Sequence, residues 1–353
     1  MKVLIVGAGP TGLTAGIELC RLGVVPTIVD RRETASTLSR AVGVTPRSLS
    51  LLKPSGVTEK LLQEAIPFHG IRIHHGTSLS LDLPLRSERM AYPYVIGMPQ
   101  DRTEALMAET LELLGGSIQF GKGFEGYEEE GGKAAVTFAD GTSGKFDVVI
   151  GADGIRSTVR EAAGIEYPGF DLEQTWSIAD VDAEGWEHPD KITLVQAGPG
   201  MIVVFAPLEA RRYRLVSSAP NALEAMPLPI NVTNIRRQGQ FKISVRQAST
   251  YSKGPVHLAG DAAHCHAPVG GRGMNLGIAD AAELAERLVN GGIEDYSGLR
   301  HRLGNEAVRI TERGRKMTGG VNLPRRVAFR TLIGAANYVP AIKRRLGRFL
   351  VEF

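Results

Sequence analysis

The chain has 353 residues, which is enough for about two structural units with a sizeable buried core. Hydrophobic residues make up 43% of the chain and charged residues 22%, and these ordinary values exclude a disordered chain, a collagen-like repeat and a membrane bundle. The net charge of +3 is too small to indicate a nucleic-acid partner, and no run of about 18 apolar residues predicts a transmembrane helix.

The first residues do not have the basic start, long apolar run and cleavage site of a signal peptide, because Gly7 and Gly9 follow a short apolar stretch at once. The two cysteines, Cys20 and Cys265, are too few for a disulfide framework or a Cys-rich metal site. We therefore expect both thiols to be free in a cytoplasmic protein. We also expect either a monomer or a homodimer.

The first thirty residues are predicted to form a strand, a helix and a second strand. Residues 2–6 and 26–30 are short apolar runs typical of strands that are buried on both faces. Between them, residues 11–22 carry apolar side chains at helical spacing, and Gly23 follows as a stop signal. The chain therefore opens with a βαβ unit.

Alternating patterns dominate two later regions. Apolar residues alternate with polar or small ones within residues 70–98, which predicts strands with one solvated face. Short runs between Gly, Pro and Arg turns predict antiparallel strands over residues 170–250, and Asp140-Gly141 marks a hairpin turn.

The remaining elements resemble those of the opening unit. Residues 102–114 have the spacing of an amphipathic helix, and continuous apolar runs at 146–150 and 256–259 predict two more buried strands. The chain after residue 277 is predicted to be helical over residues 277–290, 296–320 and 324–352.

These elements predict an α/β fold. It comprises a Rossmann-like nucleotide-binding domain, an inserted β-rich substrate domain and a helical C-terminal segment. The nucleotide-binding domain is discontinuous, because buried-type strands recur far apart in the sequence. We place it at residues 1–75, 99–169 and 254–290, the β-rich substrate domain at 76–98 and 170–253, and the helical segment at 291–353.

A glycine motif joins the first strand to the first helix. In Gly7-Ala8-Gly9-Pro10-Thr11-Gly12, the first glycine permits a tight turn, the second lets a pyrophosphate approach the backbone, and the third lets helix and strand pack closely. The helix N-terminus offers N–H groups to the phosphates. Asp30 ends the second strand, where a carboxylate accepts hydrogen bonds from an adenosine ribose. This context predicts a dinucleotide site but does not separate NAD from FAD.

Two further motifs follow buried strands. One is Gly151-Ala152-Asp153-Gly154, which continues to Arg160. The other is Gly260-Asp261-Ala262-Ala263-His264, which continues through Pro268-Val269-Gly270-Gly271-Arg272-Gly273-Met274-Asn275 into a helix that carries Asp280. In order and spacing, the three motifs resemble the class A flavoprotein monooxygenases, the para-hydroxybenzoate hydroxylase-like family. The pattern is most similar to polyketide-type and phenol-type aromatic hydroxylases without their thioredoxin-like C-terminal domain.

The resemblance implies a non-covalent FAD and NAD(P)H as co-substrate. Asp30 would bind the adenosine ribose and Asp261 the ribityl chain, while Asp153 would support the FAD and the path of the nicotinamide nucleotide. The small residues that follow Pro268 would line the isoalloxazine ring at a helix N-terminus. The implied cofactor-binding residues are Gly7, Gly9, Pro10, Thr11, Gly12, Asp30, Arg31, Arg40, Gln100, Asp153, Asp261, Pro268, Gly271, Gly273, Met274 and Asn275.

Some of these assignments have plain alternatives. Arg40 and Gln100 lie in segments that resemble FAD-contacting segments of the family, and the alternative for both is solvated surface polarity. Arg272 stands where many relatives carry Gln, so it would either favour an anionic flavin or substrate or simply face the solvent. His266 would face the substrate, pack in the interior or be solvated. We expect no metal site, because His264 and His266 have no third ligand at a metal-like spacing.

The resemblance implies an FAD-dependent monooxygenase that uses NAD(P)H and O₂. It would hydroxylate a phenolic, quinone or polyketide-like aromatic through a flavin hydroperoxide, and no side chain would attack the substrate. The alternatives are an FAD-dependent reductase or saturase of the geranylgeranyl reductase type and a non-enzymatic FAD-binding protein. A flavin halogenase is not favoured, because the chain contains no Trp-x-Trp-x-Ile-Pro segment.

The C-terminal tail combines basic and apolar residues. This pattern is compatible with an amphipathic membrane contact, but a packed terminal helix with a solvated basic face is the favoured interpretation. The basic residues are Lys343, Arg344, Arg345 and Arg348.

Overall fold

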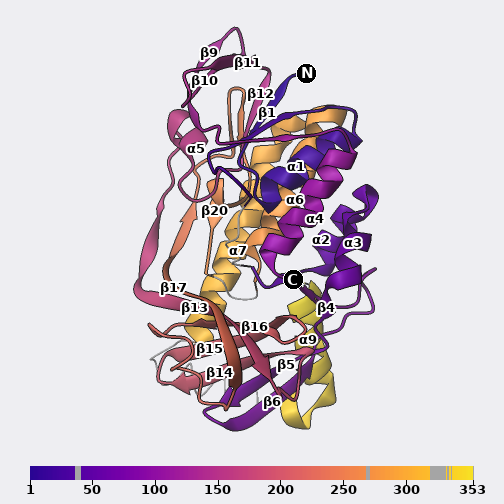
Figure 1. Cartoon of the computed structure of the whole chain (residues 1–353), viewed down its shortest axis with the longest axis vertical. Helices are drawn as coiled ribbons and strands as arrows, with labels where there is room; N and C mark the ends of the chain where they lie inside the picture. Colours follow the sequence, from indigo (N-terminus) through magenta and orange to yellow (C-terminus); the bar gives the residue numbers. More distant parts are fainter. Residues whose placement is uncertain (36–40, 268–270, 319–330, 332–333, 335, 353) are drawn as a thin grey trace.

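A computed structural model describes residues 1–35, 41–267, 271–318, 331, 334 and 336–352 (Figure 1). Arg40 and Pro268, two of the expected FAD contacts, lie outside the described residues.

A six-stranded sheet with the strand order β18-β19-β12-β1-β2-β8 forms the centre of the nucleotide-binding layer. All neighbouring pairs in it are parallel except β18 with β19. The four buried-type strands that the sequence predicts therefore lie side by side, and the α/β fold class is confirmed. The strands are β1 (Val3–Val6), β2 (Thr27–Asp30), β8 (Ile118–Phe120), β12 (Val148–Gly151), β18 (Ser252–Lys253) and β19 (Val256–Leu258).

Three helices pack together beside this sheet. Helix α1 (Pro10–Arg21) contacts both α4 (Gln100–Leu113) and α6 (Gly273–Asn290), and the three lie close together in Figure 1. Gly16 lets α1 pack closely on both the sheet and α4, because a Cβ at that position would lie 2.6 Å from Ile28 Cδ1 of β2 and 3.2 Å from Leu111 Cδ1 of α4. Shorter helices complete the layer: α2 (Pro46–Leu52), α3 (Val57–Glu64), α5 (Thr158–Ala162) and the 3₁₀ turns Lys53–Ser55, Gly260–Ala262 and Ile293–Asp295.

An eight-stranded sheet forms the second layer, with the order β20-β17-β13-β16-β15-β14-β5-β6. Its pairs are antiparallel except β5 with β14, which are parallel. The strands are β5 (Gly70–His75), β6 (Ser78–Pro84), β13 (Gly169–Glu184), β14 (Lys191–Gly198), β15 (Met201–Glu209), β16 (Arg212–Ser217), β17 (Asn231–Gln247) and β20 (His264–Cys265).

Two small sheets flank these layers. One has the order β11-β10-β9, and Gly141 lies in the turn before β11 with a φ of +78°, as the predicted hairpin requires. The other has the order β3-β7-β4. The strands are β3 (Gly43–Val44), β4 (Ile66–Pro67), β7 (Ile96–Gly97), β9 (Phe124–Glu130), β10 (Lys133–Phe138) and β11 (Ser143–Phe146).

The C-terminal segment contains α7 (Tyr296–Thr318) and α9 (Pro340–Glu352). Ile342 and Leu346 of α9 pack on the buried leucines of β6, so one side of the basic tail is a packed surface. Phe349 and Leu350 are 50% and 38% exposed on the same helix. Among the described residues, none of the helices combines the length and apolarity needed to cross a bilayer.

Candidate functional site

The first glycine motif forms the turn between β1 and α1. Gly7 has a φ of +104°, a region that favours glycine, and a Cβ on Gly12 would clash with the Gly7 carbonyl oxygen. A Cβ on Gly9 would meet no atom within 4 Å, so open space lies beside the start of the helix. Gly9 is the N-cap and has no side chain to bond the first helical N–H groups. The turn therefore fits the pyrophosphate of a dinucleotide.

Asp30 lies at the end of β2 and is 7% exposed. One carboxylate oxygen accepts from Ala8 N (2.8 Å) and Arg32 Nη2 (2.8 Å), and the other accepts from Arg32 N (2.9 Å) and Nε (3.0 Å). Burial raises the pKa of Asp30, but these bonds and the charge of Arg32 outweigh burial and hold the pKa below its ordinary value. A ribose bound to Asp30 would therefore displace Arg32. Arg31, the next residue and another of the implied FAD contacts, is exposed.

The second motif stabilises the start of α5. The Asp153 carboxylate accepts hydrogen bonds from Ser157 Oγ (2.5 Å) and Val159 N (3.2 Å). Burial raises the pKa of Asp153. Arg160 of α5 connects this motif to the third, because its Nη1 donates to the Ala262 carbonyl oxygen (3.0 Å).

The third motif places Asp261 in the 3₁₀ turn Gly260–Ala262, directly after β19. Its side chain is exposed and faces the start of α6, since a Cβ on Gly273 would lie 3.9 Å from Asp261 Oδ1. The backbone of Asp261 is fixed by Tyr167, whose Oη donates to the Asp261 carbonyl oxygen (2.8 Å). The exposed carboxylate fits a hydroxyl-rich ribityl chain.

A buried ionic network lies directly under the third motif. Asp280 of α6 is fully buried and accepts from Gly260 N (3.0 Å), His264 Nε2 (2.6 Å) and Arg300 Nε (2.6 Å). Burial raises the pKa of Asp280, but the charges of His264 and Arg300 hold it below its ordinary value. His264 is therefore a structural partner of Asp280.

Asp30 is buried and Asp261 is exposed, so alanine substitutions at these two expected FAD contacts form a matched test. Asp261→Ala should weaken FAD about ten- to a hundred-fold, because it loses a charge-assisted bond worth about 1.5–3 kcal/mol. Asp30→Ala should weaken FAD by a similar factor and also destabilise the apoprotein, because Arg32 and Ala8 N lose a buried acceptor. Titration of each apoprotein with FAD and thermal unfolding without FAD measure the two effects. An unchanged FAD affinity of Asp261→Ala would show that the third motif is misassigned.

The N-terminus of α6 lies beside β3 and the start of α2. Asn275 Oδ1 accepts from Thr45 N (2.8 Å), and Asn275 Nδ2 donates to the carbonyl oxygens of Gly43 (2.9 Å) and Gly271 (3.1 Å). The side chain of Asn275 thus fixes Gly43 and Thr45 against the start of α6, and a contact with FAD would come from the backbone of Asn275. Arg272 is the N-cap residue, and burial lowers the pKa of its guanidinium to about 10.

The half-buried Gln100 and the buried Glu104 form a hydrogen-bonded pair on α4. Gln100 Nε2 donates to Glu104 Oε1 (2.7 Å), and Gln100 Oε1 accepts from Ala41 N (3.1 Å). Burial raises the pKa of Glu104 to about 7, although the bond from Gln100 and the charge of Arg32 oppose the shift. Gln100 therefore contacts the residue that directly follows Arg40.

The raised pKa of Glu104 predicts a pH-dependent stability. The folded carboxyl holds its proton up to about pH 7, whereas the unfolded one loses it near pH 4.5. The contribution of Glu104 to the free energy of unfolding is therefore fully present below pH 4.5 and is lost as the pH rises through 7. Glu104→Gln keeps the acceptor for Gln100 but does not titrate. Between pH 5 and pH 8, the free energy of unfolding of the FAD-free variant should therefore rise by roughly 1–3 kcal/mol relative to that of the parent protein. Urea unfolding at both pH values measures the difference, and parallel pH profiles would contradict the prediction.

His266 is the second catalytic candidate from the sequence. Its Nδ1 lies 2.9 Å from the Ala267 carbonyl oxygen, which places a proton on Nδ1, and its Nε2 has no hydrogen-bond partner among the described residues. Burial lowers the pKa of His266, so the imidazole is neutral. Within the described ranges, no three His, Cys, Asp or Glu side chains are grouped as metal ligands. Cys20 and Cys265 are both free.

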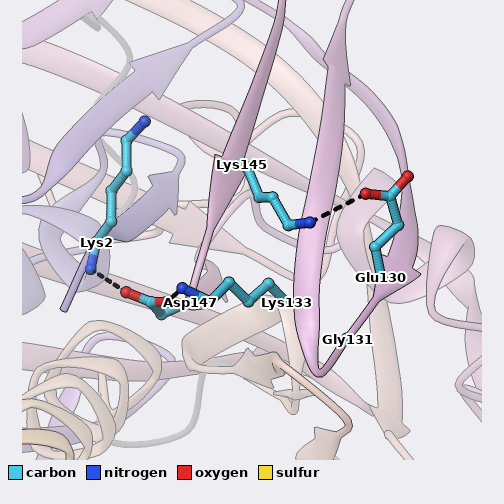
Figure 2. Close-up of a pocket in the computed structure, with 6 residues that line it drawn as sticks. All are labelled: Lys2, Glu130, Gly131, Lys133, Lys145 and Asp147. Carbon is cyan, nitrogen blue, oxygen red and sulfur yellow. Dashed lines mark hydrogen bonds and ion pairs between the residues drawn. The ribbon is translucent and has the colours of Figure 1, made fainter.

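A surface pocket of about 440 Å³ lies at the opposite edge of the central sheet (Figure 2). It adjoins the amino end of β1, whereas nucleotides bind at the carboxyl ends of parallel strands. Carboxylates pair with two of its lysines: Lys133 with Asp147 (2.7 Å) and Lys145 with Glu130 (3.1 Å). We assign it no role in the site.

The carboxyl ends of β1, β2, β12 and β19 bring the three motifs of the sequence together. The first two motifs meet because Gly7 lies against the Ala152 carbonyl group, and the first and third meet because Gly260 lies against Thr11. Sequence reasoning missed the residues that hold Asp30, Gln100, Ala41 and the third motif in place, directly or through one another. They are Arg32, Glu104, Tyr167, Asp180, Arg214 and Arg300.

Comparison with known proteins agrees with this geometry. The family described as FAD binding domain matches residues 1–225 and 218–291. The 6-methylpretetramide 4-monooxygenase of Streptomyces rimosus is 32% identical over 310 residues, which cover 82% of this chain and 56% of that protein. The rifampicin monooxygenase of Streptomyces venezuelae is 30% identical over 333 residues, 87% of this chain and 69% of that protein. This chain thus spans little more than half to about two thirds of these relatives.

One solved structure matches the fold over almost its whole length. The p-nitrophenol 4-monooxygenase PnpA from Pseudomonas putida DLL-E4 superposes with a TM-score of 0.88 at 21% identity, and the match covers 98% of this chain and 96% of that one.

Proposed function

The chain belongs to the FAD-binding-domain family of flavin-dependent aromatic monooxygenases, and we propose that it uses NAD(P)H and O₂ to hydroxylate a phenolic, quinone or polyketide-like aromatic. The observation that carries the proposal is the convergence of three motifs on one sheet edge, where they would frame both ends of a bound FAD. The reductase and the non-enzymatic FAD-binding protein are not favoured, because the matched relatives are monooxygenases.

The chain's own residues would bind the cofactor in sections. The N–H groups at the start of α1 would bind the pyrophosphate beside Gly9, and the exposed Asp261 would accept from the ribityl hydroxyls. The N–H groups at the start of α6 would stabilise negative charge on the ring system. FAD held by these residues would supply the redox chemistry that links NAD(P)H, O₂ and the substrate.

We assign Arg272 and His266 supporting roles toward the substrate side of the ring. The half-buried guanidinium of Arg272 would favour a substrate that binds as a phenolate. The neutral His266 offers Nε2 as an acceptor for a phenolic O–H, because Nδ1 already donates to Ala267.

The test is a screen of phenols, quinones and polyketide aromatics with the FAD-loaded protein. A true substrate should raise NAD(P)H oxidation at least tenfold, which corresponds to about 1.4 kcal/mol of barrier, and O₂ uptake should match the hydroxylated product formed. NAD(P)H oxidation coupled to a reduced product without O₂ uptake would favour the reductase. FAD binding with no oxidation across the screen would favour a non-enzymatic protein.

A further inference from the structure

A buried ion pair lies in the eight-stranded sheet, on strands that contain none of the three FAD motifs. Arg214 of β16 is fully buried and lies directly opposite Asp180 of β13, which is 2% exposed. Its Nε and Nη2 each donate to one carboxylate oxygen of Asp180, both at 2.7 Å. This two-point bond fixes the plane of the guanidinium group.

The third guanidinium nitrogen of Arg214 bonds a residue outside the eight-stranded sheet. Its Nη1 donates to the Ala41 carbonyl oxygen (2.8 Å), and Ala41 N donates to Gln100 Oε1 (3.1 Å). Both polar backbone groups of Ala41 are therefore held by side chains, one from the eight-stranded sheet and one from helix α4 of the nucleotide-binding layer. The two partners are 173 and 59 residues away from Ala41 in the sequence.

The rest of this segment is held mainly by the nucleotide-binding side. Met98 N donates to the Val42 carbonyl oxygen (3.2 Å), and Asn275 bonds Gly43 and Thr45. Arg214 thus acts at the end of the segment that adjoins Arg40. Gln100, an expected FAD contact among the described residues, bonds the N–H group of Ala41, so a displacement of this residue by loss of Arg214 would also alter the FAD site.

A buried pair of this kind is a weak source of stability, because removing two charges from water offsets most of their attraction. An apolar pair at these facing positions would fill the sheet equally well, but it could not bond the Ala41 carbonyl oxygen. We infer that Arg214, fixed by Asp180, is a positioning residue that couples the eight-stranded sheet to the FAD site through the Ala41 peptide and Gln100.

Arg214→Met tests the inference without leaving an unpaired charge. Asp180 keeps Arg212 at 3.6 Å and Arg237 at 3.9 Å, so the variant should fold. We expect its apoprotein to bind FAD at least tenfold more weakly and the bound flavin to show an altered visible absorption spectrum. Arg214→Lys, which keeps a charge beside Asp180 but loses the two-point bond, should show the same spectral change.

A double-mutant cycle separates positioning from general destabilisation. Arg214→Met and Gln100→Met act on the same peptide, so their effects on FAD affinity should not be additive. Arg236→Met is the matched control, because Arg236 of β17 pairs with Asp182 (2.7 Å) on the strand that also holds Asp180, but Arg236 is 45% exposed. It should leave FAD affinity unchanged and be additive with Gln100→Met.

Each outcome decides the inference. FAD affinity and flavin spectrum equal to the parent's in a folded Arg214→Met or Arg214→Lys would overturn it, as would additivity with Gln100→Met. A variant that only melts earlier, with normal FAD affinity below its melting temperature, would show a structural role alone. A parent protein that does not bind FAD would instead overturn the proposed function and the inference with it.

Discussion

Gly9→Ala is expected to remove most FAD binding while the apoprotein stays folded. A Cβ at this position meets no protein atom within 4 Å, and the Gly9 φ of −82° suits alanine, so the fold has room for it. The added methyl would occupy the space through which a pyrophosphate approaches the helix N–H groups. Loss of two charge-assisted bonds would weaken FAD about a hundred-fold or more, about 2.7 kcal/mol. Titration of the apoprotein with FAD, followed by flavin fluorescence, measures this loss.

Gly12→Ala is the matched comparison, three residues along the same turn. Here the Cβ would clash with the Gly7 carbonyl oxygen, a backbone atom that cannot rotate away. The helix would have to move off β1, so the apoprotein itself should lose about 3 kcal/mol or more, whereas Gly9→Ala should change stability by less than about 1 kcal/mol. Equal stability losses in the two variants would show that the space beside Gly9 does not serve a ligand.

The parts of the site that the sequence predicts are those with local causes. The turn at Gly7 and Gly12 follows from the needs of a strand–helix junction, and the position of Asp30 follows from where β2 ends. The same local reasoning predicts the four parallel strands, because a fully apolar run of four or five residues has no solvated face.

The parts that the sequence does not predict depend on contacts between distant residues. Arg214 meets Ala41 across 173 residues, and no spacing in the sequence records that pairing. Asp30 illustrates a second limit of the sequence. Its position at the end of β2 predicts a ribose acceptor, but in the structure the Arg32 side chain donates hydrogen bonds to both of its carboxylate oxygens. The same holds for α9, whose Ile342 and Leu346 pack on β6 from more than 250 residues earlier. The amphipathic pattern of α9 alone could not assign this contact.

Arg300→Met is expected to be the most destabilising of the substitutions considered for the nucleotide-binding layer. Asp280 and Arg300 are 0% and 2% exposed and bond through the Arg300 guanidinium at 2.6 Å. Methionine would leave the Asp280 carboxylate with His264 and Gly260 N as its remaining partners, so a buried charge would be only partly compensated. Breaking such a pair costs about 3–5 kcal/mol. Urea unfolding of the apoprotein measures it.

The exposed pair of Arg102 with Glu64 provides the control. Its bonds are just as short, both 2.7 Å, but the two side chains are 40% and 41% exposed, so Arg102→Met should cost no more than about 1 kcal/mol. Asp280→Asn combined with Arg300→Met should recover part of the loss, because it removes the uncompensated charge. FAD affinity should also fall in Arg300→Met, since Asp280 holds Gly260 N in the turn that presents Asp261. A loss no larger than that of Arg102→Met would mean that this network does not hold the third motif in place.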